Sequence, residues 1–253
     1  MLNFIGGLNM FSNLDYESIY SNISQKAFNK FNDEIKMYLC HCKLISLSSL
    51  IFDILDYGSS KKDTPLYDDI PDITYENLSE FIKSDEFNKL ELRRLFINCY
   101  EIFETTISEI IRYIHYNKPQ LALNKENKVN CDIFLKKQTK EEIVEDLINK
   151  NVNKIMYSNS VIESVRFIIK HSKSKIDNKL LEYLYACSKI RNAYVHNNGF
   201  INKEEYKKIK KYFEIEIKDV PEEFIIVVDE EIVGETISKY RKIISTLCDN
   251  LIK

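Results

Sequence analysis

The chain reads NKLLEYLYACSKIRNAYVHNNGF from Asn178 to Phe200. Its first half repeats apolar residues at the spacing of a helix with one buried face, and these are Leu180, Leu181, Leu184, Cys187 and Ile190. The sequence Asn-Asn-Gly at 197–199 is a common way to end a helix. The stretch therefore predicts a buried helix over residues 177–196, whose last turns carry Arg191, Asn192 and His196.

Three side chains at the end of this helix have complementary chemistry. At about 100° per residue, Arg191 and His196 lie roughly 140° apart around the axis, whereas Asn192 and His196 share a face. A histidine at a helix C-terminus exchanges a proton near neutral pH, and an arginine offers planar donors suited to phosphate. RNA cleavage without a metal needs a base for the 2′-hydroxyl, an acid for the leaving oxygen and a cation for the phosphorane.

The pattern R-N-x-x-x-H at 191–196 resembles the signature of the HEPN superfamily, small all-helical domains that include many RNases of toxin-antitoxin, abortive-infection and CRISPR systems. The preceding helix, the Asn-Asn-Gly turn and the segment around Tyr206 are also similar to the C-terminal half of HEPN nucleases, so the resemblance spans about Leu90 to Lys253. It implies that Arg191 and His196 are the catalytic pair and that Asn192 supports them. Many HEPN enzymes join two such motifs across a dimer. This chain carries one copy, which implies a homodimer.

The composition favours long helices. The chain has 253 residues but only 5 Gly and 4 Pro, fewer than a turn-rich β fold needs. Two strands are expected around Val220-Pro221, where the helical spacing of apolar residues gives way to an alternation of apolar and charged residues. The expected fold is all-α with a small β-hairpin near the C-terminus, and the resemblance makes it a HEPN-like helical bundle. Helices are predicted over residues 15–24, 25–57, 75–83, 84–116, 139–149, 158–172, 177–196, 203–211 and 235–252.

The helix over 25–57 is expected to bury Phe31, Tyr38 and Leu39 along one face. The stretch GSSKKDTPLYDDIPD at 58–72 then collects Gly, Ser, Pro and mixed charge, as a linker does. It separates an N-terminal helical part with linker, 1–72, from a HEPN-like helical domain, 73–253. Residues 1–13 are expected to form a poorly specified arm.

A net charge of −3 argues against a protein that coats nucleic acid nonspecifically. It is compatible with an enzyme that holds a few phosphates in a local cleft. Two basic runs near the motif are candidates for an RNA path, although plain solvation is the commoner role of lysines on a helix surface. They comprise Arg166, Lys170, Lys173, Lys175, Lys207, Lys208, Lys210 and Lys211.

No cofactor and no metal are expected. The sequence has no phosphate-binding loop, no G-x-G-x-x-G and no H-E-x-x-H. Cys40, His41 and Cys42 are expected to line the core instead of binding a metal, because residues two apart on a helix point to different sides. The six cysteines are scattered, which favours reduced thiols in a cytoplasmic protein. No apolar run reaches the roughly 18 residues of a membrane span, and the first residues lack the pattern of a signal peptide.

The sequence thus predicts a metal-independent endoribonuclease that cleaves RNA by 2′-hydroxyl attack. The resemblance implies a toxin or antiphage defence effector, with an antitoxin or defence-system protein as candidate partner. The alternative is that the motif has only a structural role, as a helix end with a solvated Arg191 and with His196 hydrogen-bonded to the last carbonyls of the helix. Two other functions stay open. One is a catalytically inactive HEPN-like module that binds RNA or a protein, and the other is a structural protein that docks through the helix at 25–57.

Overall fold

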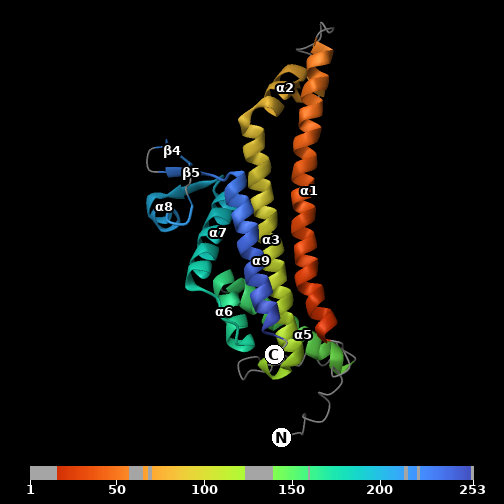
Figure 1. Cartoon of the computed structure of the whole chain (residues 1–253), viewed down its shortest axis with the longest axis vertical. Coiled ribbons are helices and arrows are strands. Elements are labelled where there is room, and N and C mark those ends of the chain that lie inside the picture. The colour runs from red at the N-terminus through yellow and green to blue at the C-terminus, as the bar shows by residue number, and fades with distance from the viewer. Residues whose placement is uncertain are drawn as a thin grey trace. The chain divides into compact units, whose positions relative to one another are not determined.

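The structure is a computed structural model of the chain, and it describes residues 16–56, 65–67, 70–122, 139–158, 160–213, 216–220 and 223–251. The helices of Figure 1 are α1 (Tyr16–Asp56), α2 (Tyr75–Lys83), α3 (Asp85–Asn117), the 3-10 turn η2 (Pro119–Leu121), α5 (Lys140–Ser158), α6 (Val161–Ser172), α7 (Asn178–His196), α8 (Lys203–Ile209) and α9 (Glu230–Asp249). The strands are β1 (Pro65–Tyr67), β2 (Ile70–Thr74), β3 (Phe200–Asn202), β4 (Glu216–Val220) and β5 (Glu223–Val227).

The fold is all-α with a small antiparallel sheet near the C-terminus, which confirms the predicted class. Strands β4 and β5 pair antiparallel, with Val220 opposite Glu223. A further strand, β3, pairs with the other edge of β5, so the strand order is β3-β5-β4. The sequence pattern missed β3 because three residues are too few to show an alternating period.

Several predicted boundaries were wrong. Helix α1 is one continuous helix and not two, because Ile23 and Ala27 are both buried and carry a single face through the expected break. Helix α5 continues past residue 149 because the fully buried Val152 extends its apolar face. Helix α9 begins earlier than residue 235 because the side chain of Asp229 accepts a hydrogen bond from the backbone amide of Ile232 at 2.7 Å, as an N-cap does.

The predicted linker at 58–72 contains β1 and the start of β2, which pair antiparallel. The rest of that linker and the expected arm at 1–13 lie outside the described residues. In α1, Phe31 and Tyr38 are buried as predicted, but Leu39 is 53 % exposed. A step of about 100° per residue explains this, since Tyr38 and Leu39 cannot both face inward.

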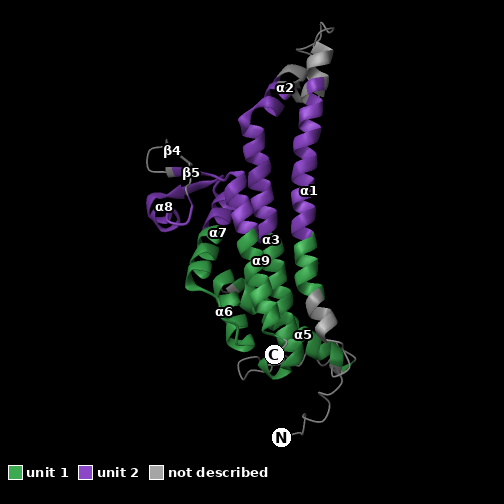
Figure 2. Ribbon diagram, in the orientation of Figure 1, with its two compact units in different colours: residues 1–29, 101–188, 238–253 green, residues 30–100, 189–237 purple. Residues whose placement is uncertain are grey.

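The chain forms two compact units that interleave along the sequence (Figure 2). Unit 1 comprises residues 1–29, 101–188 and 238–253, and unit 2 comprises residues 30–100 and 189–237. Helices α1, α3, α7 and α9 contribute residues to both. The domain boundary expected after residue 72 stays a prediction.

Unit 1 is built on large apolar side chains from five helices. The ring of Phe103 stacks on that of Tyr240 at 4.5 Å between centroids, and both rings are buried. Stacked aromatic pairs add to the free energy gained from burying their area. Other fully buried side chains of this core are Ile107, Ile110, Ile111, Ile148, Ile168 and Leu184.

His115 is a buried polar side chain of unit 1. Its Nδ1 lies 2.8 Å from the carbonyl oxygen of Ile111, and its Nε2 lies 2.8 Å from Nδ2 of Asn151. A neutral ring with its proton on Nδ1 donates to Ile111 and accepts from Asn151, so both nitrogens are satisfied without a charge. The ring also stacks on Phe167. Burial lowers the pKa of His115, and the Ile111 carbonyl opposes that effect.

The protein should lose stability as the pH falls below about 6.5, the ordinary pKa of histidine. Because the pKa of His115 is lower in the folded state, the unfolded chain takes up a proton that the folded chain does not bind. His115→Gln should reduce the pH dependence of the unfolding free energy by up to about 1.4 kcal/mol per pH unit. Urea unfolding at several pH values from neutral to mildly acidic measures this slope. Leu90→Gln, an uncharged change at an exposed position, provides the control and should leave the slope unchanged. An unchanged slope in His115→Gln would contradict the assignment.

Candidate active site

Helix α7 ends at His196, as the sequence predicts. The backbone amides of Asn197 and Gly199 both donate to the carbonyl oxygen of Ala193 at 2.9 Å. Gly199 has a φ of +89°, and a Cβ added there would lie 3.2 Å from the Tyr194 ring. The predicted stop is therefore confirmed, and glycine is required by both its backbone conformation and its close neighbour.

Tyr194 ties the end of α7 to the small sheet. Its hydroxyl donates to the carbonyl oxygen of Ile226 at 3.0 Å and accepts from the backbone amide of Val228 at 3.2 Å. The edge of its ring packs on Phe96. Burial raises the pKa of Tyr194 to about 12, while the Val228 amide and the charge of Arg93 act in the opposite direction. The hydroxyl thus stays neutral, and both of its hydrogen bonds persist across the physiological pH range.

Arg93 of α3 holds the same turn of α7 from another side. Its Nη2 donates to the main-chain carbonyl oxygen of Tyr194, and its guanidinium carbon lies 4.8 Å from the centroid of the Tyr194 ring. A cation at a helix C-terminus is favoured by the helix dipole. Sequence reasoning missed Arg93, because nothing in the spacing of α3 distinguishes it from other arginines on a helix surface.

The three motif residues occupy the last turns of α7. Arg191 is half-buried, with its guanidinium carbon 5.8 Å from the centroid of the buried Tyr100 ring. Its Nη1 donates to Oδ1 of Asn192 at 3.3 Å. Asn192 and His196 are both exposed. The structure therefore joins Arg191 to Asn192 directly and leaves the imidazole of His196 open to solvent.

Helix α8 lies against the same end of α7. Nζ of Lys189 pairs with Oε1 of Glu205 at 3.0 Å, and the side chain of Asn202 caps α8 by accepting from the Glu205 amide. The ring of Tyr206 stacks on Phe224 of β5. Unit 2 thus contains both the motif and one of the predicted basic runs, whose exposed residues are Lys207, Lys208, Lys210 and Lys211.

The other basic run, residues 166–175, belongs to unit 1. There, Nη1 of Arg166 pairs with Oε1 of Glu163 at 2.6 Å in an exposed position. A surface ion pair of this kind contributes little to stability. The contact leaves that guanidinium partly neutralised.

The cysteine cluster on α1 does not line the core as a whole. Cys40 is exposed and Cys42 is half-buried, because this part of α1 turns one side outward. Nδ1 of His41 lies 2.9 Å from Oε2 of Glu91. Within the described ranges, no group of three or more Cys, His, Asp or Glu residues is placed to hold a metal ion. Cys131 lies outside the described residues, and the described cysteines of the core are Cys99, Cys187 and Cys248.

Comparison with known proteins gave no relative: no family model, no curated protein and no solved structure matches the chain. In the part of the chain that the structure describes, none of the helices combines the length and apolar character of a membrane span.

Tyr194→Phe should destabilise the protein by about 1–3 kcal/mol, because it leaves the buried Ile226 carbonyl and Val228 amide without their partner. Urea or thermal unfolding measures the change. Tyr157→Phe is the matched control: this tyrosine is 86 % exposed, so the loss of its hydroxyl should change stability by less than about 0.5 kcal/mol. Equal effects of the two substitutions would show that Tyr194 does not anchor the helix end.

Proposed function

We propose that the protein is a metal-independent endoribonuclease of the HEPN type. His196 exchanges protons with the reacting oxygens, Arg191 stabilises the phosphorane, and Asn192 holds the arginine in place. The observation that supports this most is the placement of the three residues on one clamped helix end, with His196 exposed and Nη1 of Arg191 bonded to Asn192. A rigid helix end positions catalytic groups better than a loop does.

The reaction is an internal transesterification of RNA. The ribose 2′-oxygen forms a bond to phosphorus while its proton passes to a base, and the bond from phosphorus to the 5′-oxygen breaks as an acid protonates that oxygen. The products are a 2′,3′-cyclic phosphate and a 5′-hydroxyl. One imidazole cannot hold both protonation states at once, so the two roles need two histidines or one histidine and another group.

A second copy of the chain supplies the second imidazole in this proposal. Each chain carries one motif, and Arg191 and His196 lie roughly 140° apart on α7. A phosphate that contacts both kinds of group is therefore best held between two motifs. Val195, next to His196, is 44 % exposed, which offers an apolar contact at the centre of such a dimer. The exposed lysines of α8 then guide RNA to the cleft by their charge.

The biological role rests on the resemblance alone. An RNase of this family acts in the cytoplasm as a toxin or an antiphage effector and is held in check by an antitoxin or a defence-system partner. Induced expression tests this role directly, since the active enzyme should arrest growth and His196→Ala should not.

Purified protein should cleave tRNA, mRNA or rRNA in the presence of EDTA and leave 2′,3′-cyclic phosphate ends. His196→Ala and Arg191→Ala should each lower the rate by about 100- to 10,000-fold, the usual contribution of an acid-base or charge-stabilising group. Lys179→Ala, an exposed change in the first turn of the same helix, is the control and should retain full activity.

Loss of cleavage in EDTA, or full activity in His196→Ala, would contradict the mechanism. RNA that is retained on a gel with intact ends, and released by Arg191→Ala, would instead indicate the catalytically inactive binding module.

Val195→Glu should both dissociate the dimer and abolish cleavage. It places a carboxylate in the apolar contact beside His196, and the carboxylates of the two chains repel each other. Sedimentation velocity reports the dimer, and the RNA assay reports the activity. Tyr157→Glu changes a more exposed large side chain, on α5, and should affect neither the dimer nor the cleavage. A monomeric wild-type protein with full activity would contradict the composite site.

A further inference from the structure

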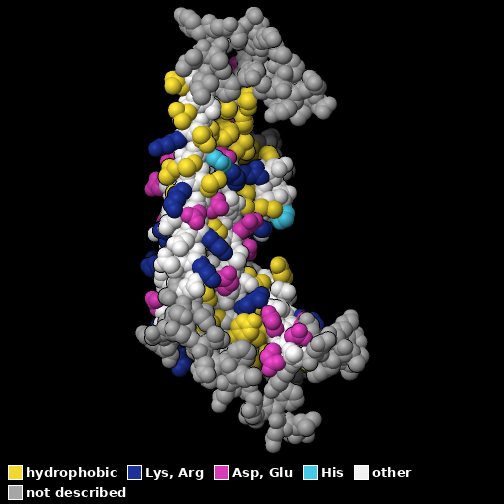
Figure 3. Space-filling model, turned by 90° about the vertical axis from the view of Figure 1, so that its right-hand side faces the viewer, with side chains coloured by type: hydrophobic (Ala, Val, Ile, Leu, Met, Phe, Trp, Pro, Cys, Tyr) yellow, Lys and Arg dark blue, Asp and Glu magenta, His cyan; other side chains and the backbone are white. Residues whose placement is uncertain are grey.

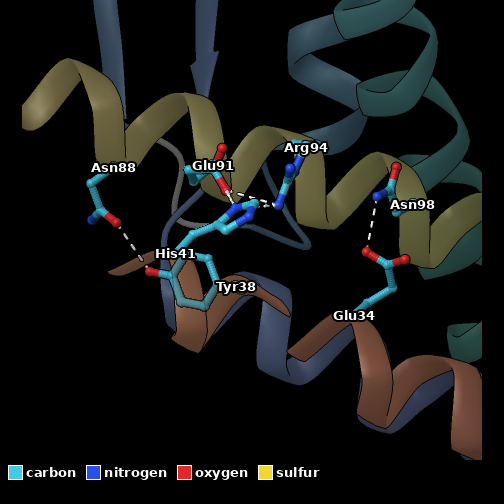
Figure 4. A network of polar contacts seen from close by, with 7 residues as sticks. All are labelled: Glu34, Tyr38, His41, Asn88, Glu91, Arg94 and Asn98. Carbon is cyan, nitrogen blue, oxygen red and sulfur yellow. Dashed lines mark hydrogen bonds and ion pairs between the residues drawn. The ribbon is translucent and has the colours of Figure 1, made fainter. Parts of the chain in front are cut away.

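Helix α1 turns polar side chains toward α3 (Figure 4). Oε2 of Glu34 accepts from Nδ2 of Asn98 at 2.9 Å. The hydroxyl of Tyr38 donates to Oε1 of Glu230 at 2.7 Å and lies 3.0 Å from Oδ1 of Asn88. All of these residues belong to unit 2. Hydrogen bonds of partly buried groups are directional, so they fix the rotation of α1 about its own axis.

A second polar contact lies further along the same face. Nδ1 of His41 is 2.9 Å from both Oε2 of Glu91 and Nη2 of Arg94, and these last two atoms also pair at 2.9 Å. The carboxylate of Glu91 is only 13 % exposed. Glu91 and Arg94 both belong to α3 and pair with each other, so turning α1 away would remove His41 and leave the partly buried Glu91 carboxylate with one hydrogen-bond partner fewer. Rotating α1 so that this face points outward would therefore cost free energy.

The exposed side of α1 carries several large apolar side chains. Figure 3 shows hydrophobic side chains gathered over this helix. The large ones are 51–59 % exposed and comprise Met37, Leu39, Leu44, Leu47 and Leu50. Met37, the exposed Cys40, Leu44 and Leu47 follow the spacing of three and four residues, which forms one stripe along a helix. We call these four residues the α1 stripe.

An ordinary surface helix buries its large apolar residues and exposes polar ones, whereas α1 buries one apolar face and leaves the α1 stripe exposed as well. Single exposed leucines are common, but a continuous apolar surface on a folded chain marks a contact with another molecule. The three-four spacing is the one that a second helix fills with its own side chains. The polar contacts with α3 keep the stripe outward, so it stays available to such a helix.

The charges beside the stripe indicate the chemistry of the partner. Lys36 and Lys43 are exposed there, and Nζ of Lys36 pairs with Oδ1 of Asp33 at 3.1 Å. No Asp or Glu occurs from Ile35 to Leu50, the segment that contains Lys43. In a parallel second copy of α1, Lys36 and Lys43 would face His41 and Ser48 of the other helix, neither of which is a carboxylate. An antiparallel copy centred on this segment would set Lys43 against Lys43. Like charges brought together at an interface are unfavourable. Carboxylates on the partner would instead pair with Lys43 and share Lys36 with Asp33.

We propose that the α1 stripe binds an acidic amphipathic helix of another protein, with apolar residues in the stripe and Glu or Asp beside Lys36 and Lys43. The surface is distinct from the motif. On α3, Arg94 contacts His41 of α1, whereas the preceding residue, Arg93, contacts Tyr194 of α7. The α1 stripe shares no residue with the motif, so the proposed contact does not include His196. This inference does not depend on the ribonuclease activity.

A synthetic helix of about three heptads tests the proposal. The peptide carries Leu at the first and fourth positions of each heptad and Glu at the flanking positions, and a matched peptide has Lys in place of every Glu. Fluorescence anisotropy with the full-length chain should show binding of the acidic peptide and at least roughly tenfold weaker binding of the basic one. High salt should weaken the acidic complex.

Two variants locate the binding surface. The double substitution Leu44→Glu with Leu47→Glu should weaken binding of the acidic peptide by at least about tenfold, because it places carboxylates in the stripe. Tyr157→Glu, at an exposed position of α5, should leave the binding of the acidic peptide unchanged. Circular dichroism and urea unfolding confirm that both variants are folded, as expected for changes at exposed positions.

Four results would overturn the proposal. The first is an absence of binding by the acidic peptide, and the second is equal affinity for the two peptides. The third is binding that the double substitution does not change. The fourth is wild-type self-association, seen by sedimentation, that the double substitution abolishes, since the occupant is then a second copy. If the stripe binds vesicles of phosphatidylserine and phosphatidylcholine in preference to the acidic peptide, a membrane surface replaces the protein partner.

Discussion

The buried hydroxyl of Tyr194 holds the end of helix α7, and the proposed active site depends on it. A hydroxyl in the core costs free energy unless it is hydrogen-bonded, and here it bonds to both Ile226 and Val228. These two bonds join the last turn of the helix to the strand β5 and the residue just beyond it. The backbone of His196 is therefore fixed, although its own side chain is exposed to solvent.

Positive charge gathers at this helix end for a physical reason. The last carbonyls of α7 carry partial negative charge. The amides after the helix satisfy the Ala193 carbonyl, and the guanidinium of Arg93 satisfies that of Tyr194. Arg191 adds a second guanidinium one turn earlier, above the ring of Tyr100. The same arrangement that completes the helix thus provides cations where the proposed reaction develops negative charge on a phosphate.

Local signals in the sequence were sufficient where the structure is determined by near neighbours. The end of α7 follows from Asn-Asn-Gly, and the start of α5 follows from Thr139 and Glu142, whose side chains accept from each other's backbone amides. Features set by distant residues could not be predicted. Arg93 meets Tyr194 across about a hundred positions of sequence, and β3 is a strand only because β5 lies beside it.

The rotation of α1 shows most clearly what a single sequence leaves open. From Met37 onward this helix has apolar residues on every side, so its pattern indicates a helix without saying which side faces the core. The prediction placed Leu39 inside, whereas the structure places Glu34, Tyr38 and His41 toward α3. The hydrogen-bond partners on α3 and α9 determine which side of α1 faces inward. A buried polar group without a partner costs more free energy than an exposed leucine. The polar contacts with α3 and the burial of Phe31 favour the same orientation of the helix, and that orientation leaves the leucines outward.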